Sequence, residues 1–474
     1  MAPPIVTILS GLLLAIALVL VPIEARAVQL NPSGLGQVLL FPYYTARSTP
    51  EGAYATLFVV TNTTSDAKVL RVRFRESRNG REAAGANLYL RAFDSWSGAV
   101  YVGDGGLRAG SQDHSCTDPL FIPLTNAQYS ESNADGEDTS PDRSAEGYIE
   151  IIEMGVIADP TLLDAMEPKW IDSTLVYPNC YDVRDIPLDN QTKVAPPSGG
   201  MTGSAFLINV LEGTLYSEDA VALDDFSHVA LWGRPDPATP SLQDVNPKVS
   251  KVLDVSGYRE SQWSTDKGAN PVDPVSAVLM QNQLLNQFVL DAATRSGTDW
   301  VVTMPTKPAY VSSPGHASPP FESAFETGGA PDYFGIAPGC IGADGTMEFD
   351  RESNHDNQII GFPELPPYCP HALSLPWVAN VVTFNNSNVL GSTIGIAVIG
   401  LYEDGWMRLE PFQYATSNVH RLVSTDTPPV TYFGLPMIGF MANNYRNGAL
   451  PTVSGPVLSN YSATSAHKGS LRIE

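Results

Sequence analysis

Short apolar runs separated by turn-forming residues dominate the chain from residue 36 onward. Runs of this length, rich in Val, Leu, Phe and Tyr and bounded by Gly, Pro, Asn, Asp and Ser, are typical of β-strands. Four of them follow one another: GQVLLFPYYT (36–45), YATLFVVTNTT (54–64), KVLRVRFRES (68–77) and ANLYLRAF (86–93). Further strands are predicted at 96–102, 147–154, 203–211 and 227–232. The spacing of these strands predicts a β-sandwich.

The second part of the chain returns to the β pattern after one predicted helix. Asp273-Pro274 offers an N-cap followed by proline at the first helical position, and apolar residues then recur near helical spacing. A helix is therefore predicted over about 275–291. A second, shorter helix is predicted at 159–166, where Asp159-Pro160 repeats the start signal. Strand-like runs resume from 298 and again from 379.

A proline-rich segment divides the chain into two predicted domains. GRPDPATPSLQDVNPKVS (233–250) contains four prolines, a composition that favours a stiff connection. The sequence therefore predicts a mainly β protein with two Ig-like β-sandwich domains, long loops and one or two short helices. The predicted parts are a signal peptide (1–27), an N-terminal domain (28–235), a linker (236–250) and a C-terminal domain (251–474) with a Pro- and Gly-rich excursion (312–371).

The first residues predict export. Ile5 to Leu20 is an almost unbroken apolar run, and Ala25-Arg26-Ala27 fits the small-x-small pattern at which a secretory signal is cleaved. The mature chain is then expected to begin at Val28, to be secreted to the periplasm, the cell surface or the outside, and to have no stable membrane insertion. No Lys or Arg precedes the apolar run, so an uncleaved anchor is the alternative.

The charge balance limits the partners. The chain has 27 Lys and Arg against 51 Asp and Glu, a net charge of −24. Such a charge repels nucleic acids and anionic membranes at long range, so no nucleic-acid partner is expected. It is compatible with basic partners, with divalent cations and with an extracellular polymer or protein as the partner.

Four cysteines lie in the predicted exported part. Export favours their oxidation to disulfides. Four cysteines allow three pairings, and the sequence does not choose among them. We favour Cys116 with Cys180 and Cys340 with Cys369, because each pair would tie one long loop region of one half. The spacing between the cysteines does not match a zinc site.

One strand carries a row of arginines. Residues 69–76 read VLRVRFRE, so Arg71, Arg73 and Arg75 leave one face of the predicted strand. We expect an acidic strand of the same sheet to neutralise them, because opposite charges on adjacent strands are a routine feature of sheets. The candidate is EGYIEIIEM (146–154), with Glu146, Glu150 and Glu153. An external anionic ligand is the alternative.

An acidic loop raises the question of a metal. ESNADGEDTSPDRSAE (131–146) offers Asp135, Glu137, Asp138 and Asp142 as oxygen ligands. Calcium prefers six to eight such oxygens, but the spacing does not match the known calcium-loop pattern. A solvated acidic loop explains the same residues. Apart from this possible calcium ion, the sequence predicts no cofactor.

Motifs for catalysis are missing where they would be expected. The sequence contains no G-x-S-x-G nucleophile turn, no H-E-x-x-H zinc motif and no phosphate-binding loop. Exposed aromatic residues are the other route to function, because they stack on ligands. Trp96 and Trp406 lie beside predicted turns or strand ends and could face a ligand, although burial in a sandwich core is the more common fate of a tryptophan.

Several segments together resemble a family of uncharacterised exported and cell-surface proteins of proteobacteria. They are GQVLLFPYYT, LRVRFRESRNGRE, NLYLRAFDSW, EGYIEIIEMG and TDWVVTMPTK. The resemblance implies a location in the envelope or outside the cell and brings no catalytic residues. We therefore expect a structural or binding role without catalysis, such as adhesion, matrix assembly or recognition of a surface polymer. An extracellular hydrolase of a polysaccharide or polyester and a calcium-stabilised surface scaffold are the alternatives.

Overall fold

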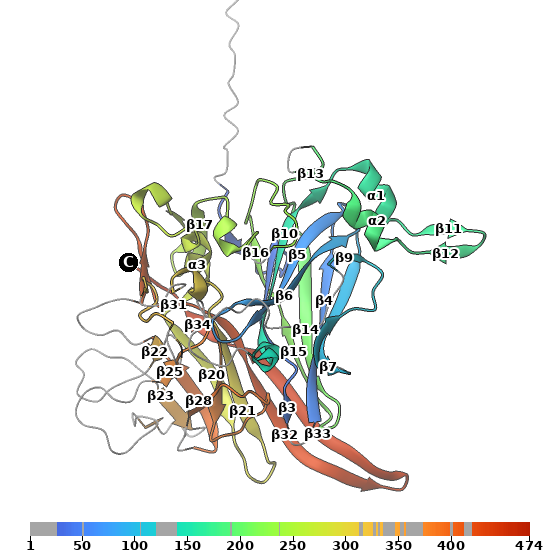
Figure 1. Ribbon diagram of the computed structural model, residues 1–474. Helices are drawn as coiled ribbons and strands as arrows, with labels where there is room; N and C mark the ends of the chain where they lie inside the picture. The colour runs from blue at the N-terminus through green and yellow to red at the C-terminus, as the bar shows by residue number, and fades with distance from the viewer. Residues whose placement is uncertain are drawn as a thin grey trace, which may run out of the picture.

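The computed structural model shows a mainly β protein with several sheets (Figure 1). The residues it describes are 26–49, 52–104, 106–119, 140–189, 192–236, 238–311, 316–325, 329, 332–334, 347–350, 355–356, 373–398, 402–411 and 420–474. Residues 1–25 of the predicted signal peptide, Cys340, Cys369 and most of the 312–371 excursion therefore lie outside the described residues.

Two sheets form the N-terminal half, which extends from β1 to β16. The first has eight strands: β1 (Gln29–Leu30), β16 (Val221–Asp224), β2 (Val38–Thr45), β10 (Glu146–Ile157), β5 (Lys68–Glu76), β6 (Glu82–Leu90) and β9 (Cys116–Asp118), with β13 (Val194–Ala195) beside β10. The second has six: β15 (Thr214–Asp219), β14 (Met201–Asn209), β4 (Gly52–Asn62), β7 (Ser95–Gly103) and β8 (Gly106–Gly110), with β3 (Ser48–Thr49) beside β4.

The two sheets share one apolar core. Phe41 and Ile151 from the first sheet meet Phe58 and Trp96 from the second. The position of β2 between two cores accounts for the continuous apolar run in its sequence. Leu39 and Phe41 enter this core, whereas Val38 and Leu40 enter a second core that also contains residues of the C-terminal half. Because both faces of β2 are buried, the strand has no need of a polar face.

The C-terminal half extends from β17 to β35. One five-stranded sheet contains β24 (His355–Asp356), β23 (Met347–Asp350), β28 (Asp404–Leu409), β20 (Gln283–Val289) and β34 (Lys468–Ser470). The other contains β27 (Gly395–Val398), β26 (Ala379–Phe384), β21 (Gly297–Thr303), β32 (Ile438–Thr452) and β33 (Gly455–Ala466). Aromatic packing joins them: the ring centroids of Phe288 and Trp300 each lie 5.2 Å from that of Phe384.

Smaller elements complete this half. The short sheets are β17 (Val249–Asp254) with β18 (Gly257–Gln262), β19 (Met280–Gln281) with β31 (Leu435–Pro436), β22 (Asp332–Phe334) with β25 (Leu373–Leu375), and β29 (Arg421–Val423) with β30 (Thr431–Phe433) and β35 (Arg472–Ile473). Among the described residues, the 3-10 helices are η2 (Pro141–Ala145), which belongs to the N-terminal half, η3 (Leu242–Asp244), η4 (Thr265–Lys267) and η5 (Lys307–Ala309).

The α-helices are short. Helix α1 (Pro160–Met166) begins where it was predicted, with the side chain of Asp159 accepting a hydrogen bond from Leu162 N. Helix α2 (Cys180–Asp185) was not predicted. Helix α3 (Asp273–Leu279) begins one residue earlier than predicted, with Val272 instead of Asp273 at the N-cap, and ends after seven residues. None of the described helices is long and apolar enough to cross a membrane.

Two predictions of secondary structure are wrong. The residues predicted as the second part of a helix, up to 291, form β19 and β20 instead. Leu284 and Phe288 are four residues apart, which fits a helix, but they also fit a period of two, and pairing with β28 and β34 favours the strand. The predicted strand at 227–232 is irregular, with one backbone bond from Leu231 N to Met154 O.

The segment predicted as a linker, 236–250, is packed against the body of the protein. Leu242 and Val245 are buried in the core that both halves share. Val28 N donates to Val249 O at 3.0 Å, so the beginning of β1 is held beside the same segment. The chain between the halves is therefore fixed by burial as well as by its prolines.

Candidate functional site

A disulfide joins β9 to α2 at one edge of the N-terminal half. Cys116 and Cys180 are bonded, with their Cα atoms 5.0 Å apart, which confirms the pairing predicted for them. The hairpin of β11 (Lys169–Ile171) and β12 (Thr174–Val176) follows α1 and projects away from the sheets (Figure 1). The residues just before each cysteine, 113–115 and 177–179, are thereby brought to one place.

A pocket of about 160 Å³ lies beside this disulfide. Residues of β6 and of the turn after it form one wall of the pocket, and the residues just before β9 form a second wall. The end of α1 and the end of the β11–β12 hairpin form the rest of the lining. The lining residues are Tyr89, Arg91, Asp94, Asp113, His114, Ser115, Cys116, Met166, Pro168, Tyr177 and Pro178. We call this cavity the disulfide-edge pocket.

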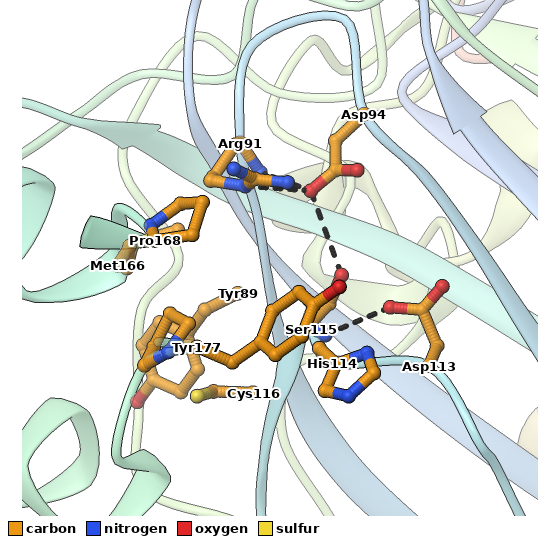
Figure 2. Close-up of a pocket in the computed structure, with 11 residues that line it drawn as sticks. Tyr89, Arg91, Asp94, Asp113, His114, Ser115, Cys116, Met166, Pro168 and Tyr177 are labelled. Atoms are coloured by element: carbon orange, nitrogen blue, oxygen red, sulfur yellow. Dashed lines mark hydrogen bonds and ion pairs between the residues drawn. The ribbon is translucent and has the colours of Figure 1, made fainter. Parts of the chain in front are cut away.

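One side of the disulfide-edge pocket is a connected set of polar groups (Figure 2). Arg91 Nε donates to Asp94 Oδ2 at 3.1 Å, and Ser115 Oγ donates to the same oxygen at 3.5 Å. The backbone N–H of Ser115 donates to Asp113 Oδ1 at 2.7 Å. Glu167 adds a second carboxylate 3.6 Å from Arg91. Donors and acceptors are therefore held in place before any ligand arrives.

The other side of the pocket is aromatic and apolar. The rings of His114 and Tyr177 are stacked, with centroids 3.5 Å apart and an interplanar angle of 14°. Both residues are exposed. Tyr89 also lines the pocket and is buried, and its burial, together with the negative charge of Asp118, raises the pKa of the Tyr89 phenol to about 12. The phenol thus stays neutral over the physiological pH range.

The arrangement is suited to binding. Within this fully described pocket, the hydroxyl of Ser115 is directed to Asp94, and no hydrogen bond joins it to His114. A serine nucleophile needs a base within hydrogen-bond reach, so the pair does not form a Ser–His dyad. A concave site with a few fixed polar groups and an aromatic wall is the usual form of a ligand pocket.

The arginine row does not face a ligand. The side chains of Arg71 and Arg73 are 2% and 0% exposed, and that of Arg75 is 14% exposed. Arg71 and Arg73 pair with Glu82 at 2.7 and 2.9 Å. Arg73 and Arg75 pair with Glu150 at 3.1 and 3.0 Å. The predicted internal pairing of the arginines is therefore confirmed. The alternative, that the three side chains face a ligand, is wrong because they are buried or largely buried.

The predicted acidic partners pair with four different cations. Glu150 pairs with the arginine row, whereas Glu146 pairs with Arg47 and Glu153 pairs with Lys68. Burial alone would raise the pKa of Glu150, but the charges of Arg75 and Arg73 outweigh it and hold the pKa below its usual value. Glu150 is therefore ionised at neutral pH, as a partner of two arginines must be.

Backbone carbonyls of the packed segment complete the arginine row's contacts. Arg71 and Arg73 donate to Asp236 O at 3.0 and 3.2 Å, and Arg73 also donates to Pro240 O. The row thus holds the chain that connects the two halves against the first sheet.

The two candidate tryptophans have different surroundings. Trp96 is fully buried, and its ring packs edge-on against Phe58 with centroids 5.3 Å apart, so it is a core residue and faces no ligand. Trp406 in β28 is half-buried, lies opposite Gln287 and Phe349 and takes no part in the disulfide-edge pocket. The most exposed tryptophan of the described chain, Trp170 at 73%, was not singled out from the sequence.

The calcium hypothesis falls mainly on residues outside the described ranges. Asp135, Glu137 and Asp138 are among these. Asp142 is described and pairs with Arg47. Within the described part of the chain, no group of three or more His, Cys, Asp or Glu side chains is arranged to hold a metal ion.

The pocket itself was missed, although a signal for it was present. The pairing of Cys116 with Cys180 implies that His114 and Ser115 meet Tyr177 and Pro178 in space. Aromatic and polar residues flank both cysteines, and this combination could have marked the site.

Comparisons of the chain with protein-family models, with curated proteins and with solved structures find no match. The chemistry of the pocket is therefore the basis on which function is inferred.

Proposed function

We propose that this protein is an exported binding protein that recognises a polymer of the cell surface or its surroundings without catalysis, through the disulfide-edge pocket. One observation carries the proposal. A stacked aromatic wall, His114 on Tyr177, faces the pre-ordered polar set of Arg91, Asp94, Asp113 and Ser115 across a small cavity. Groups fixed before binding lose little entropy when the ligand arrives.

Three features of the chain support export. The disulfide is of the kind that persists in oxidising compartments. The first 27 residues read as a signal peptide, and several segments resemble exported proteobacterial proteins. In this proposal each half is a β-sandwich domain of the Ig-like type that presents loops at its edges, and the pocket belongs to the edge of the first.

The test is binding of the purified protein to cell envelopes from the organism that makes it. Arg91→Ala removes the donor of the polar set and frees Asp94, so binding should weaken at least about tenfold, the equivalent of one charged hydrogen bond. Arg259→Ala is the matched control, because Arg259 Nε contacts Asp254 at 3.3 Å with similar exposure but lies in β18.

Two results would contradict the proposal. Equal binding by the Arg91→Ala variant and the wild type would remove the pocket from the interaction. Steady release of product from an envelope polymer, lost in Asp94→Asn or Asp113→Asn, would make the protein a hydrolase, since these two carboxylates flank Ser115.

A further inference from the structure

We propose, on the basis of the function above, that the polymer is a neutral polysaccharide. One pyranose ring occupies the disulfide-edge pocket, and neighbouring rings lie along one face of the β11–β12 hairpin. Size, chemistry, register and charge each contribute to this assignment.

The size of the pocket fits one six-membered ring. A cavity of roughly 150 Å³ in a protein core holds a benzene molecule. The disulfide-edge pocket measures about 160 Å³ and opens to solvent, so ring substituents can extend beyond it. A longer or branched ligand would have to place most of its atoms outside.

The chemistry of the pocket is two-sided, as that of a pyranose is. A pyranose has C–H groups on its faces and hydroxyl groups around its edge. The His114–Tyr177 stack offers an aromatic surface for a C–H face. Arg91 offers donors, and Asp94 and Asp113 offer acceptors, for the hydroxyls. A wholly apolar ligand would leave these polar groups desolvated and unpaired.

The register of the hairpin continues the aromatic surface outward. Trp170 and Leu175 are cross-strand partners, so their side chains share one face. Pro168 lies two residues before Trp170, and Tyr177 lies two residues after Leu175, so both are expected on the same face. Both residues line the pocket. Trp170 is therefore on the face that leads out of the pocket, and its side chain is largely exposed.

The distance along the hairpin requires a chain of rings. Two residues of a β-strand span roughly 7 Å, which separates the position of Tyr177 from that of Trp170. A monosaccharide held in the pocket cannot contact both aromatic residues, whereas linked rings can. Ile171 and Val176 lie on the opposite face of the hairpin and are also exposed, so they are not part of this surface.

The charge of the site selects against acidic sugars. Asp94 and Glu167 pair with Arg91, the one Lys or Arg among the lining residues; Asp113 adds a further carboxylate to the pocket, and the chain as a whole carries −24. A polyanion would be repelled at long range and would compete with the carboxylates already paired to Arg91. The ligand is therefore a polysaccharide without carboxylate or sulfate groups.

The experiment is isothermal titration calorimetry with defined oligosaccharides. The probes are hexasaccharides of glucose (β-1,4 and α-1,4 linked), of mannose and of N-acetylglucosamine, with the matching monosaccharides and with hexagalacturonate as the acidic probe. Saturable binding of at least one neutral hexasaccharide is expected. Hexagalacturonate should bind at least about tenfold more weakly than that probe.

Two variants separate the pocket from the hairpin. Tyr177→Ala should weaken binding of the hexasaccharide and of the monosaccharide alike, by about tenfold, whereas Trp170→Ala should weaken binding of the hexasaccharide only. Tyr461→Ala is the control, because Tyr461 is 61% exposed on β33. An unchanged unfolding temperature shows that each variant is folded, as the exposure of Trp170 and Tyr177 leads us to expect.

The outcomes distinguish the ligand class from the proposed function. Absence of saturable binding to every neutral hexasaccharide, or tighter binding of hexagalacturonate, would overturn the neutral polysaccharide even if envelope binding still depends on Arg91. Equal hexasaccharide binding by Trp170→Ala and the wild type would overturn the role of the hairpin. Loss of the Arg91 dependence on envelopes would instead contradict the proposed function itself.

Discussion

Asp299 shows how burial makes a single carboxyl group sensitive to pH. The residue lies in β21 and is fully buried. Its side chain accepts hydrogen bonds from Leu390 N at 2.8 Å and from Ser387 Oγ at 2.7 Å. Burial nevertheless dominates and raises the pKa of Asp299 from 3.8 to about 6. The folded protein therefore binds a proton at this site more tightly than the unfolded chain does.

The Asp299→Asn variant should lose part of the pH dependence of stability. Because the folded-state pKa is raised, the stabilisation from Asp299 is complete below pH 3.8 and disappears as the pH rises through about 6. The change amounts to about 3 kcal/mol. Relative to the wild type, the variant should gain stability as the pH rises from about 4 to about 7 in denaturant unfolding. Parallel pH profiles for the two proteins would show that the pKa of Asp299 is the same in the folded and unfolded states.

At the same scale, the arginine row shows what sequence reasoning can and cannot reach. The alternation in VLRVRFRE correctly placed Arg71, Arg73 and Arg75 on one side of a strand, and Glu150 was among their predicted partners. Glu82 was not, because its position opposite the row depends on the pairing of β6 with β5. The carbonyls of Asp236 and Pro240 come from a distant segment whose position no local pattern encodes.

At the scale of elements, the disulfide holds the pocket together. Cys116 directly follows Asp113 to Ser115 of the polar side, and Cys180 is the first residue of helix α2, just after Tyr177 and Pro178. Apart from this bond, the hairpin contributes few buried side chains, since β11 and most of β12 are exposed. The covalent link therefore fixes the aromatic wall relative to the polar side.

Replacement of both residues, Cys116→Ser with Cys180→Ser, should weaken ligand binding more than it disturbs the fold. The bond closes a loop of 64 residues, so its loss should lower the free energy of unfolding by about 4 kcal/mol. Envelope binding should fall at least about tenfold at temperatures where circular dichroism still shows a folded protein. Retention of full binding by the folded variant would show that packing alone orders the pocket.

The elements also show where local patterns are ambiguous. The start of α3 was predictable because Asp273-Pro274 is a local signal. Its end was not, because Leu284 and Phe288 fit both a helix and the strand β20, and the partner strands β28 and β34 are distant in sequence. Of the pocket, only the residues beside Cys116 and Cys180 could be predicted to lie together, from the pairing of the cysteines. The remaining lining residues come from separate turns, whose positions no local pattern indicates.

At the scale of the whole molecule, one buried carboxylate connects the two halves. Glu146 begins β10 and is fully buried. It accepts hydrogen bonds from Tyr43 and Arg47 of the N-terminal half and from Ser392 and Thr393 of the C-terminal half. A carboxylate with this many donors is costly to remove, because the donors lose their shared partner.

Glu146→Ala should destabilise the whole protein. Arg47 would lose its buried partner, so the free energy of unfolding should fall by about 3–5 kcal/mol, measured by urea denaturation followed through tryptophan fluorescence. Asp142→Asn is the control, because Asp142 pairs with the same arginine but is 71% exposed, and its loss should cost less than about 1 kcal/mol. Equal effects of the two changes would refute the connecting role of Glu146.

The path of the chain between Cys116 and Cys180 has a further consequence. Those residues include β10, the strand between β2 and β5 in the first sheet. Oxidation thus closes a covalent ring that includes a central strand of the first sheet and part of the pocket lining. Under the proposed export, the ring would stay open in the reducing cytoplasm, and the aromatic wall of the pocket would not yet be fixed there. The affinity for the proposed ligand would then rise on arrival in oxidising surroundings, which would limit premature capture of the cell's own sugars.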